Sequence, residues 1–174
     1  MTTARQLHFS YEDYLRALDS SALKLEYCSG VIYAKAGGTL AHAELSAAAI
    51  RILGTALLGR CTVLTSDAKV RVESSDFAGF PDATVVCGAR QSSRIDANAL
   101  INPTVIVEVT SRSTEQYDRG EKLEHYQRLP SVKAVLFVSH RERRVTVVER
   151  RAQWASGGRW RTRHARRTGA ELPG

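Results

Sequence analysis

The stretch NPTVIVEVTSRSTEQYDRGEKLEHYQRLPSVKAVLFVS, residues 102–139, decides the fold of this chain. Its first apolar run, residues 104–110, is hydrophobic on both faces except at Glu108, a pattern typical of a central strand that is covered on each side. A polar segment follows, and its second half is helical and ends before Pro130. A further strand is expected over residues 132–140. Strand, helix and strand in this order indicate an α/β domain.

The sequence before and after this stretch extends the same pattern. One helix is expected over residues 9–18, where Ser10 is a suitable N-cap, and a second over the Ala- and Leu-rich residues 39–59. Residues 24–37 are expected to form two strands joined by a turn at Ser29-Gly30. Further strands are expected at residues 61–66, 68–73, 82–87 and 143–151.

Length and composition fit one globular domain. The chain has 174 residues, of which 43% are hydrophobic and 25% charged, and no linker or internal repeat divides it. We therefore predict an α/β domain over residues 1–151, with a mixed β-sheet flanked by helices, and an arginine-rich C-terminal tail over residues 152–174. No apolar run approaches the roughly 20 residues that a membrane span needs, and the N-terminal segment lacks the apolar core of a signal peptide. A cytoplasmic location without membrane contact is expected.

The three cysteines, Cys28, Cys61 and Cys87, are widely spaced and lie in strand-like segments. The sequence has no Cys-x-x-Cys metal motif, and an odd number of cysteines argues against a disulfide framework. We therefore predict three buried free thiols.

The positive charge is concentrated toward the C-terminal end. Residues 1–140 hold 15 basic and 15 acidic side chains, whereas residues 141–174 hold 10 arginines and 3 acids, which accounts for the net charge of +7. A basic patch attracts polyanions, and an aromatic residue among arginines suits stacking on single-stranded bases. Candidate nucleic-acid-binding residues are Arg159, Trp160, Arg161 and Arg163. A solvated tail without a partner is an equally supported alternative.

Two carboxylates stand out against their apolar surroundings. Asp82 follows Pro81 at the start of an apolar strand, and Glu108 lies inside the valine-rich strand. A buried carboxylate is costly unless it is paired or bound to a metal. On neighbouring strands the two side chains would converge on one divalent cation, and hard oxygen ligands of this kind suit Mg²⁺ or Mn²⁺. For Asp82 alone, a solvated turn residue is the alternative.

Lys122 is the third candidate. Asp118, Lys122 and Tyr126 are four residues apart in turn, so they share one face of the predicted helix. A lysine that points into a metal site can orient the attacking water and stabilise negative charge that develops on a phosphate. The alternative is an exposed ion pair between Asp118 and Lys122, and spacing alone favours it.

These residues resemble a known nuclease pattern. The order Pro-Asp in FPDATVVCG and Glu-Val-Thr in VIVEVTS is similar to the PD-(D/E)XK nuclease superfamily. The chain resembles the Uma-two endonuclease-like family of that superfamily, a family of restriction endonucleases, from about Tyr11 to Arg151. The specific part of the resemblance is the stretch from Asn102 to Ser139. The resemblance implies a restriction-endonuclease-like core with a Mg²⁺-dependent phosphodiesterase site, in which Asp82 and Glu108 are metal ligands.

The resemblance also departs from the superfamily pattern. Thr110 stands where the superfamily usually has its lysine, and Lys122 on the following helix is the residue that matches in this family. Glu26 and His42 match further recurrent residues of the family and would support the site. For Glu26 the alternative is a cross-strand pair with Lys24 or Lys35, and for His42 it is local hydrogen bonding at the start of a helix. These two supporting roles, and that of Thr110, are implied by the resemblance alone.

The resulting prediction is a metal-dependent endonuclease that hydrolyses phosphodiester bonds, with Asp82, Glu108 and Lys122 as catalytic residues and Mg²⁺ or Mn²⁺ as the cofactor. We favour DNA over RNA as the substrate. Cutting both strands of a duplex would suit a homodimer. The alternative is a nucleic-acid-binding module of the same fold with little or no turnover, because Thr110 replaces the usual lysine and the C-terminal segment is rich in arginine.

Overall fold

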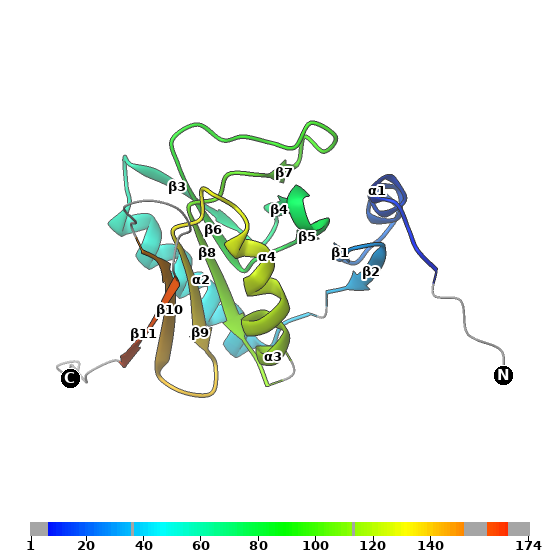
Figure 1. Ribbon diagram of the computed structural model, residues 1–174. Coiled ribbons are helices and arrows are strands. Elements are labelled where there is room, and N and C mark those ends of the chain that lie inside the picture. Colours follow the sequence, from blue (N-terminus) through cyan, green and yellow to red (C-terminus); the bar gives the residue numbers. More distant parts are fainter. Residues whose placement is uncertain (1–6, 36, 113, 152–159, 167–174) are drawn as a thin grey trace.

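Two β-sheets form the centre of the molecule in the computed structural model, which describes residues 7–35, 37–112, 114–151 and 160–166 (Figure 1). The larger sheet has the strand order β11-β10-β9-β8-β6-β3. β8 and β9 are parallel, and the other neighbouring pairs in this sheet are antiparallel. The six strands are β3 (Cys61–Thr65), β6 (Ala83–Cys87), β8 (Val105–Thr110), β9 (Ala134–Ser139), β10 (Arg144–Arg150) and β11 (Trp160–Arg166).

The stretch of residues 102–139 forms the parallel pair and its connection. After β8 the chain passes through α3 (Glu115–Tyr117), a π-helical turn η2 (Asp118–Lys122) and α4 (Leu123–Gln127), and then returns as β9. Parallel neighbours need a crossover of this kind because a tight turn can join only antiparallel strands. The predicted order of strand, helix and strand is confirmed, and α4 ends before Pro130 as expected.

The smaller sheet has the strand order β2-β1-β5-β4-β7. β1 and β2 form the predicted hairpin, and its turn residues Ser29 and Gly30 both have positive φ angles, 45° and 88°. The 3-10 turn η1 (Glu73–Ser75) joins β4 to β5. β5 and β7 are not predicted from the sequence, because two or three residues are too short to show a strand period. The five strands are β1 (Leu25–Cys28), β2 (Val31–Ala34), β4 (Lys69–Val72), β5 (Phe77–Gly79) and β7 (Ala99–Leu100).

Helix α1 (Tyr11–Asp19) begins with a capping box. Asp13 N–H donates to Ser10 Oγ at 3.1 Å, and Ser10 N–H donates to Asp13 Oδ2 at 2.9 Å, which confirms the predicted N-cap. The buried rings of Tyr11 and Tyr14 pack against Tyr27 of β1, with ring centroids 5.4 Å apart in both pairs. This aromatic cluster fixes α1 on the smaller sheet.

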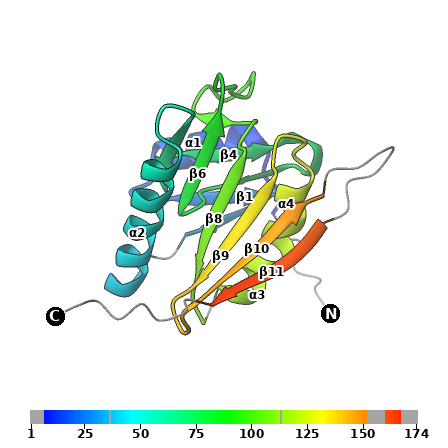
Figure 2. The same ribbon diagram turned by 90° about the vertical axis from the view of Figure 1, so that its left-hand side faces the viewer.

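Helix α2 (Leu40–Ala56) and α4 lie on opposite faces of the larger sheet (Figures 1 and 2). α2 contacts β3, β6 and β8. Thr39 caps it, because its hydroxyl accepts a hydrogen bond from His42 N–H at 3.3 Å. None of the 17 residues of α2 is buried in the described structure. The helix is therefore confirmed, but its apolar residues are only partly covered.

The main hydrophobic core lies between the larger sheet, α4 and the smaller sheet. Trp160 packs against this core from β11, and the Arg150 guanidinium group lies 4.6 Å from the centre of its ring. Residues 160–166, which the sequence analysis places in the tail, thus form the edge strand of the larger sheet. The buried core residues are Cys28, Val70, Val72, Phe77, Ile106, Tyr126, Leu129, Val132, Val135, Phe137 and Val148. The predicted fold class, a mixed α/β fold with an N-terminal helix and hairpin, is confirmed.

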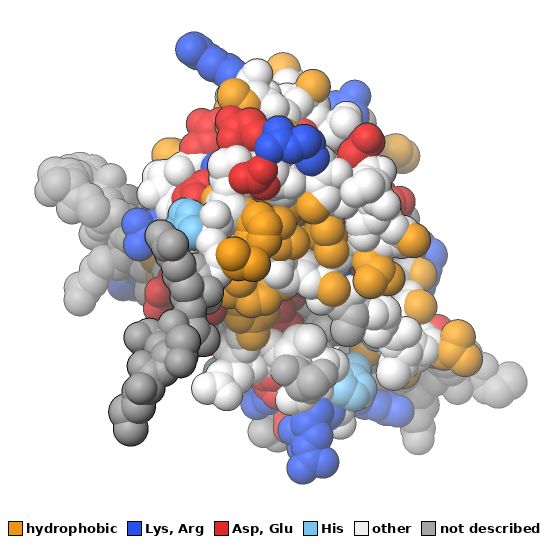
Figure 3. All heavy atoms as spheres, turned by 90° about the vertical axis from the view of Figure 1, so that its right-hand side faces the viewer, with side chains coloured by type: hydrophobic (Ala, Val, Ile, Leu, Met, Phe, Trp, Pro, Cys, Tyr) orange, Lys and Arg blue, Asp and Glu red, His pale blue; other side chains and the backbone are white. Residues whose placement is uncertain are grey.

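The side of the molecule that carries α1 and the β1–β2 hairpin shows hydrophobic side chains gathered near its centre, with acidic side chains above them (Figure 3). Exposed hydrophobic residues in this part of the chain include Leu23 and Tyr33. Among the described residues, no helix is long and apolar enough to cross a membrane.

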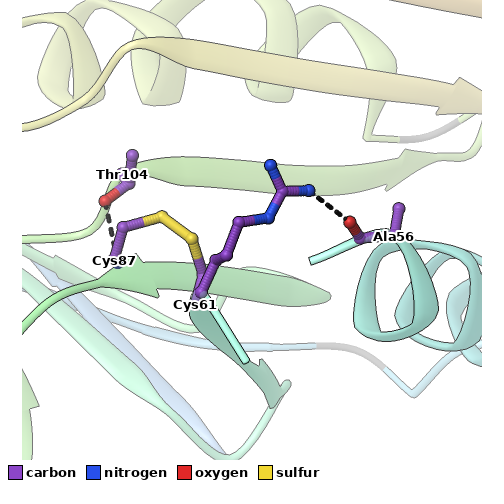
Figure 4. Close-up of a disulfide and its surroundings, with 5 residues drawn as sticks. Ala56, Cys61, Cys87 and Thr104 are labelled. Atoms are coloured by element: carbon purple, nitrogen blue, oxygen red, sulfur yellow. Dashed lines mark hydrogen bonds between the residues drawn. A yellow bond between two sulfur atoms is a disulfide. The ribbon is translucent and has the colours of Figure 1, made fainter. Parts of the chain in front are cut away.

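The prediction of three free thiols is wrong for two of the cysteines. Cys61 on β3 and Cys87 on β6 form a disulfide (Figure 4). β3 and β6 are antiparallel, and their register sets Cys61 directly opposite Cys87 with a Cα–Cα distance of 4.2 Å. The two residues are 26 positions apart in the chain, so only the strand register reveals that they are neighbours. Cys28 is free and buried, as predicted.

Candidate active site

Asp82 and Glu108 lie side by side at adjacent strands. β6 pairs with β8 in the register Ala83↔Val107, and the same register continued by one residue sets Asp82 opposite Glu108. Val109 N–H donates to Asp82 Oδ2 at 2.7 Å, which holds the Asp82 carboxylate against β8. Both residues are buried, Asp82 with 4% and Glu108 with 2% of its surface exposed. Asp82 is therefore not a solvated turn residue.

The Lys122 ammonium group lies among three carboxylates. Its Nζ is 3.1 Å from Glu26 Oε1, 3.5 Å from Glu108 Oε1 and 3.7 Å from Asp118 Oδ1. Asp118 and Lys122 are four residues apart on the π-helical turn, and both are buried. The alternative of an exposed surface pair is therefore wrong. π-Helical turns are frequent at functional sites, and this one brings the lysine to β8 and β1 at once.

Glu26 reaches the same cluster from β1. Its Oε1 accepts hydrogen bonds from Lys122 Nζ and, at 3.0 Å, from the Phe80 N–H group. The alternative pairing of Glu26 with Lys24 or Lys35 does not occur. Lys24 Nζ lies 2.7 Å from Asp67 Oδ1 instead, and Lys35 pairs with another carboxylate of the site.

Two basic side chains cover the outer side of Asp82. Lys35 Nζ lies 3.2 Å from Asp82 Oδ1, and His42 Nε2 lies 3.2 Å from Asp82 Oδ2. His42 belongs to the first turn of α2, whereas Lys35 follows β2 directly. Their side chains are 23% and 21% exposed, compared with 5% for Asp82. Lys35 and His42 therefore mark the solvent side of the cluster.

Thr110 and Tyr126 complete the surroundings of Glu108. The Tyr126 hydroxyl donates to Glu108 Oε1 at 2.8 Å, so the tyrosine is more than a packing residue. Thr110 is the last residue of β8 and is 2% exposed. Its carbonyl oxygen lies 2.9 Å from His140 Nδ1. The position that usually holds lysine in the superfamily is therefore a buried strand end in this chain.

Burial and the neighbouring charges shift the pKa values of Glu108 and Lys122 in opposite directions. Burial, which disfavours the charged carboxylate, raises the pKa of Glu108 to about 7, although the Lys122 ammonium group acts against this rise. Burial also raises the pKa of Asp118. Burial alone would lower the pKa of Lys122, but the carboxylates of Glu108, Glu26 and Asp118 raise it above its ordinary value. Burial therefore favours the neutral form of Glu108, whereas the surrounding carboxylates favour the charged form of Lys122.

The donor set fits a hard divalent cation. Four carboxylates, those of Glu26, Asp82, Glu108 and Asp118, face the ammonium groups of Lys35 and Lys122. The fully ionised cluster thus has two more negative than positive charges from these groups, which one divalent ion would balance. Carboxylate oxygens are also the ligands that Mg²⁺ and Mn²⁺ prefer.

Sequence reasoning missed Lys35 and Tyr126 as members of the site. Lys35 stands at the end of a hairpin strand, where a solvated lysine is ordinary, so nothing in its sequence surroundings marks it as functional. Tyr126 lies four residues after Lys122, so the two share a helix face. This four-residue spacing is the sequence signal for its contact with Glu108.

Three of the four predicted nucleic-acid-binding residues, Trp160, Arg161 and Arg163, lie on β11, where each contacts another side chain of the protein. Arg161 and Arg163 both pair with Glu149 of β10, the second through Nε at 3.0 Å from Glu149 Oε1. The Trp160 ring is partly buried against Arg150 and the core. Arg159 lies outside the described residues.

Comparison with known proteins adds three findings. The family model Uma2, described as "Putative restriction endonuclease", matches residues 11–173. The uncharacterised proteins slr1290 and sll1609 of Synechocystis sp. (strain ATCC 27184 / PCC 6803 / Kazusa) are 34% identical over 131 residues and 25% identical over 127 residues. These alignments cover 75% of this chain and 68% of slr1290, and 72% of this chain and 72% of sll1609.

A solved structure is also similar. It is described as "a putative nuclease belonging to DUF820" from Anabaena variabilis ATCC 29413 and has a TM-score of 0.71 at 15% sequence identity. The match covers 95% of this chain and 88% of that chain, and at this level of identity it shows a shared fold.

Proposed function

Because this chain belongs to the Uma2 family, whose description is "Putative restriction endonuclease", and holds a buried acidic cluster around a lysine, we propose that it is a Mg²⁺-dependent endonuclease that hydrolyses phosphodiester bonds of DNA. The observation that carries the proposal is the position of Lys122 between Glu26 and Glu108, the residue that lies opposite Asp82 on the neighbouring strand. A charged lysine that is buried among carboxylates is expensive to maintain for stability alone. A catalytic role for Lys122 explains the arrangement better than a contribution to stability does.

Asp82 and Glu108 would hold the metal ion. A Mg²⁺ or Mn²⁺ ion held by these two carboxylates would supply polarisation of the scissile phosphate and a bound water of lowered pKa. The Asp82 carboxylate is oriented by Val109 N–H, Lys35 and His42, and Glu108 by Tyr126 and Lys122. These fixed hydrogen bonds reduce the reorganisation that the site needs when the substrate binds.

Lys122 would act on the substrate directly. Glu26 and Asp118 hold its side chain in place through their ion pairs with Nζ. The ammonium group then positions the attacking water and balances the negative charge that grows on the phosphate. Lys35 and His42 lie on the exposed side of Asp82, so an incoming phosphate would meet their positive charge first.

The test is cleavage of supercoiled plasmid and of single-stranded DNA by the purified full chain in Mg²⁺ or Mn²⁺. We expect Asp82→Asn, Glu108→Gln and Lys122→Met each to lower the rate by about 100-fold or more. The matched control is Asp67→Asn, because the Asp67 side chain is 82% exposed and pairs with Lys24 away from the cluster.

The possible results separate the proposal from its alternative. Cleavage that survives Asp82→Asn or Glu108→Gln would overturn the proposal, because a contaminating nuclease would then be the better explanation. A folded protein that binds DNA with a steep salt dependence but does not cut in either metal would be the binding module, as Thr110 at the usual lysine position suggests.

A further inference from the structure

A second group of metal-binding side chains lies outside the acidic cluster. Cys28 of β1, Glu121 of the π-helical turn and His125 of α4 bring one ligand atom each within 4.8 Å of one another. Cys28 Sγ is 3.4 Å from His125 Nε2 and 3.5 Å from Glu121 Oε1. Glu121 is the chain neighbour of Lys122, but its carboxylate faces Cys28 rather than Glu26.

The fold brings these three residues together from distant parts of the chain. Glu121 and His125 are four residues apart, so they share one face of the helical segment. Cys28 is the last residue of β1 and is free and buried. The pairing of β1 with β5, which sets Cys28 beside Phe77, brings the end of β1 under this helical face.

The distances fit a tetrahedral zinc ion. A zinc ion with a thiolate at about 2.3 Å and an imidazole nitrogen at about 2.1 Å holds these two atoms about 3.6 Å apart at the tetrahedral angle. A thiolate and a carboxylate oxygen are held at nearly the same separation. The separations of Cys28 Sγ from the histidine nitrogen and the carboxylate oxygen, 3.4 and 3.5 Å, agree with this geometry. The Glu121 and His125 ligand atoms lie within 4.8 Å of each other, a distance that side-chain rotation can shorten.

The histidine is supported as zinc-binding histidines usually are. His125 Nδ1 lies 2.8 Å from Ser75 Oγ, and its ring stacks on Phe77 with centroids 4.4 Å apart and planes inclined by 8°. When Nδ1 donates to the serine hydroxyl, Nε2 keeps its lone pair on the side of Cys28. A hydrogen bond from the second nitrogen that fixes tautomer and ring orientation is typical of metal-binding histidines.

We propose that Cys28, Glu121 and His125 form a zinc site with three protein ligands. Zinc binding displaces the thiol proton of Cys28 to solvent, since the thiolate is the ligand. Three protein ligands leave the fourth position for water or another small ligand. Glu121 also lines an open pocket of about 470 Å³ together with Gln116, Tyr117 and Gly120, so solvent can reach this edge of the site.

The two sites of the molecule differ in the metal that each one suits. A thiolate and an imidazole select zinc, whereas the carboxylates around Lys122 select Mg²⁺ or Mn²⁺. Because the zinc ligands come from β1 and from the helical segment that carries Lys122, zinc would link the two elements that hold the lysine. This inference stands independently of DNA cleavage.

Titration of the full chain with Co²⁺ tests the site, with Zn²⁺ as the competing ion. In the disulfide-bonded protein Cys28 is the remaining thiol of the three cysteines, so a thiolate-to-cobalt charge-transfer band identifies it as a ligand. We expect this band, together with the visible bands of tetrahedral cobalt, to saturate at one equivalent and to disappear when Zn²⁺ is added. Zn²⁺ should also raise the melting temperature of the wild-type protein.

Four variants sharpen the test. Cys28→Ser should abolish the charge-transfer band, and Glu121→Gln, at an exposed position where folding is not at risk, should weaken zinc binding at least tenfold. Glu124→Gln, an exposed glutamate on the same helical segment, is the matched control and should bind zinc like the wild type. Glu108→Gln should leave the band unchanged. The site is disproved if disulfide-bonded wild-type protein with a free Cys28 thiol shows no band at one equivalent, or if Glu121→Gln binds zinc as tightly as Glu124→Gln.

Discussion

Glu108 connects the stability of the protein with the chemistry proposed for it. The side chain is fully enclosed by β8, α4 and the π-helical turn, and it accepts hydrogen bonds from Tyr126 and Lys122. Burial nevertheless raises its pKa to about 7. A carboxyl whose pKa is higher in the folded protein than its ordinary value of 4.5 binds its proton more tightly in the folded state. The stabilisation from this group is therefore complete below pH 4.5 and is lost as the pH rises to about 7.

The Glu108→Gln variant should accordingly be more stable than the wild type at alkaline pH. Glutamine has nearly the shape of the neutral acid and carries no charge to bury. We expect the free energy of unfolding at pH 8 to rise by up to about 3 kcal/mol in the variant, and the difference to shrink toward pH 4.5. Urea denaturation at pH 5 and pH 8, with EDTA present to remove metal ions, measures this difference.

The exposed Glu124→Gln variant is the control and should follow the wild type at both pH values. A Glu108→Gln protein that is less stable than the wild type at pH 8 would contradict the prediction. It would mean that the ion pair with Lys122 outweighs the cost of burying the charge.

The sequence predicts site residues whose charge contrasts with an apolar neighbourhood. It does not predict site residues whose local sequence is ordinary. Glu108 in a valine-rich strand and Asp82 before an apolar run are exceptional in their local sequence. Lys35 has no such context, and its contact with Asp82 depends on how the end of the hairpin meets β6. The π-helical turn that carries Lys122 also leaves no signal in the sequence, although the resemblance to a nuclease family identified the residue.

At the scale of helices and strands, the disulfide between β3 and β6 has the clearest effect on stability. β3 is the edge strand of the larger sheet, and Cys61–Cys87 ties it to its only neighbour in that sheet. A cross-link that closes a loop of this length stabilises a fold by about 3 kcal/mol, chiefly by restricting the unfolded chain. Composition and spacing could not reveal this bond, because it depends on a register that forms only when the sheet forms.

We expect the double variant Cys61→Ser/Cys87→Ser to melt roughly 6–12 °C below the wild type. Scanning calorimetry of both proteins, with and without dithiothreitol, measures the effect. The reductant should lower the melting temperature of the wild type and leave the variant unchanged. Equal melting temperatures for the two oxidised proteins would contradict the prediction.

The same bond bears on the predicted cytoplasmic location. Reducing compartments disfavour structural disulfides. The oxidation state of Cys61 and Cys87 in freshly lysed cells, measured by alkylation and mass spectrometry, is therefore a direct test of that location.

At the scale of the whole molecule, the order of elements was predictable because long apolar periods define β8, β9 and α2. The division of the strands between two sheets could not be predicted from the sequence. It depends on short strands such as β5 and β7, whose partners β1 and β4 lie far from them in the chain. α2 is the element whose packing departs most from its sequence. An Ala- and Leu-rich helix is expected to be buried, yet none of the described residues of α2 is buried, and its main contacts are with β3, β6 and β8 of the larger sheet.

Cutting both strands of duplex DNA would suit a dimer, and we expect two copies of the chain to associate through α2. Leu40 and Ile52 on α2 are 84% and 58% exposed, and Leu58 just beyond it is 82% exposed. Ile52 is the large apolar residue exposed within the body of α2, and we place the contact between two copies there. We expect the wild type to sediment as a dimer at micromolar concentration and Ile52→Glu to sediment as a monomer. Leu23→Glu, at a residue that is 59% exposed, is the matched control and should stay dimeric. A wild-type monomer, or dimers that dissociate with Leu23→Glu but not with Ile52→Glu, would rule out this interface.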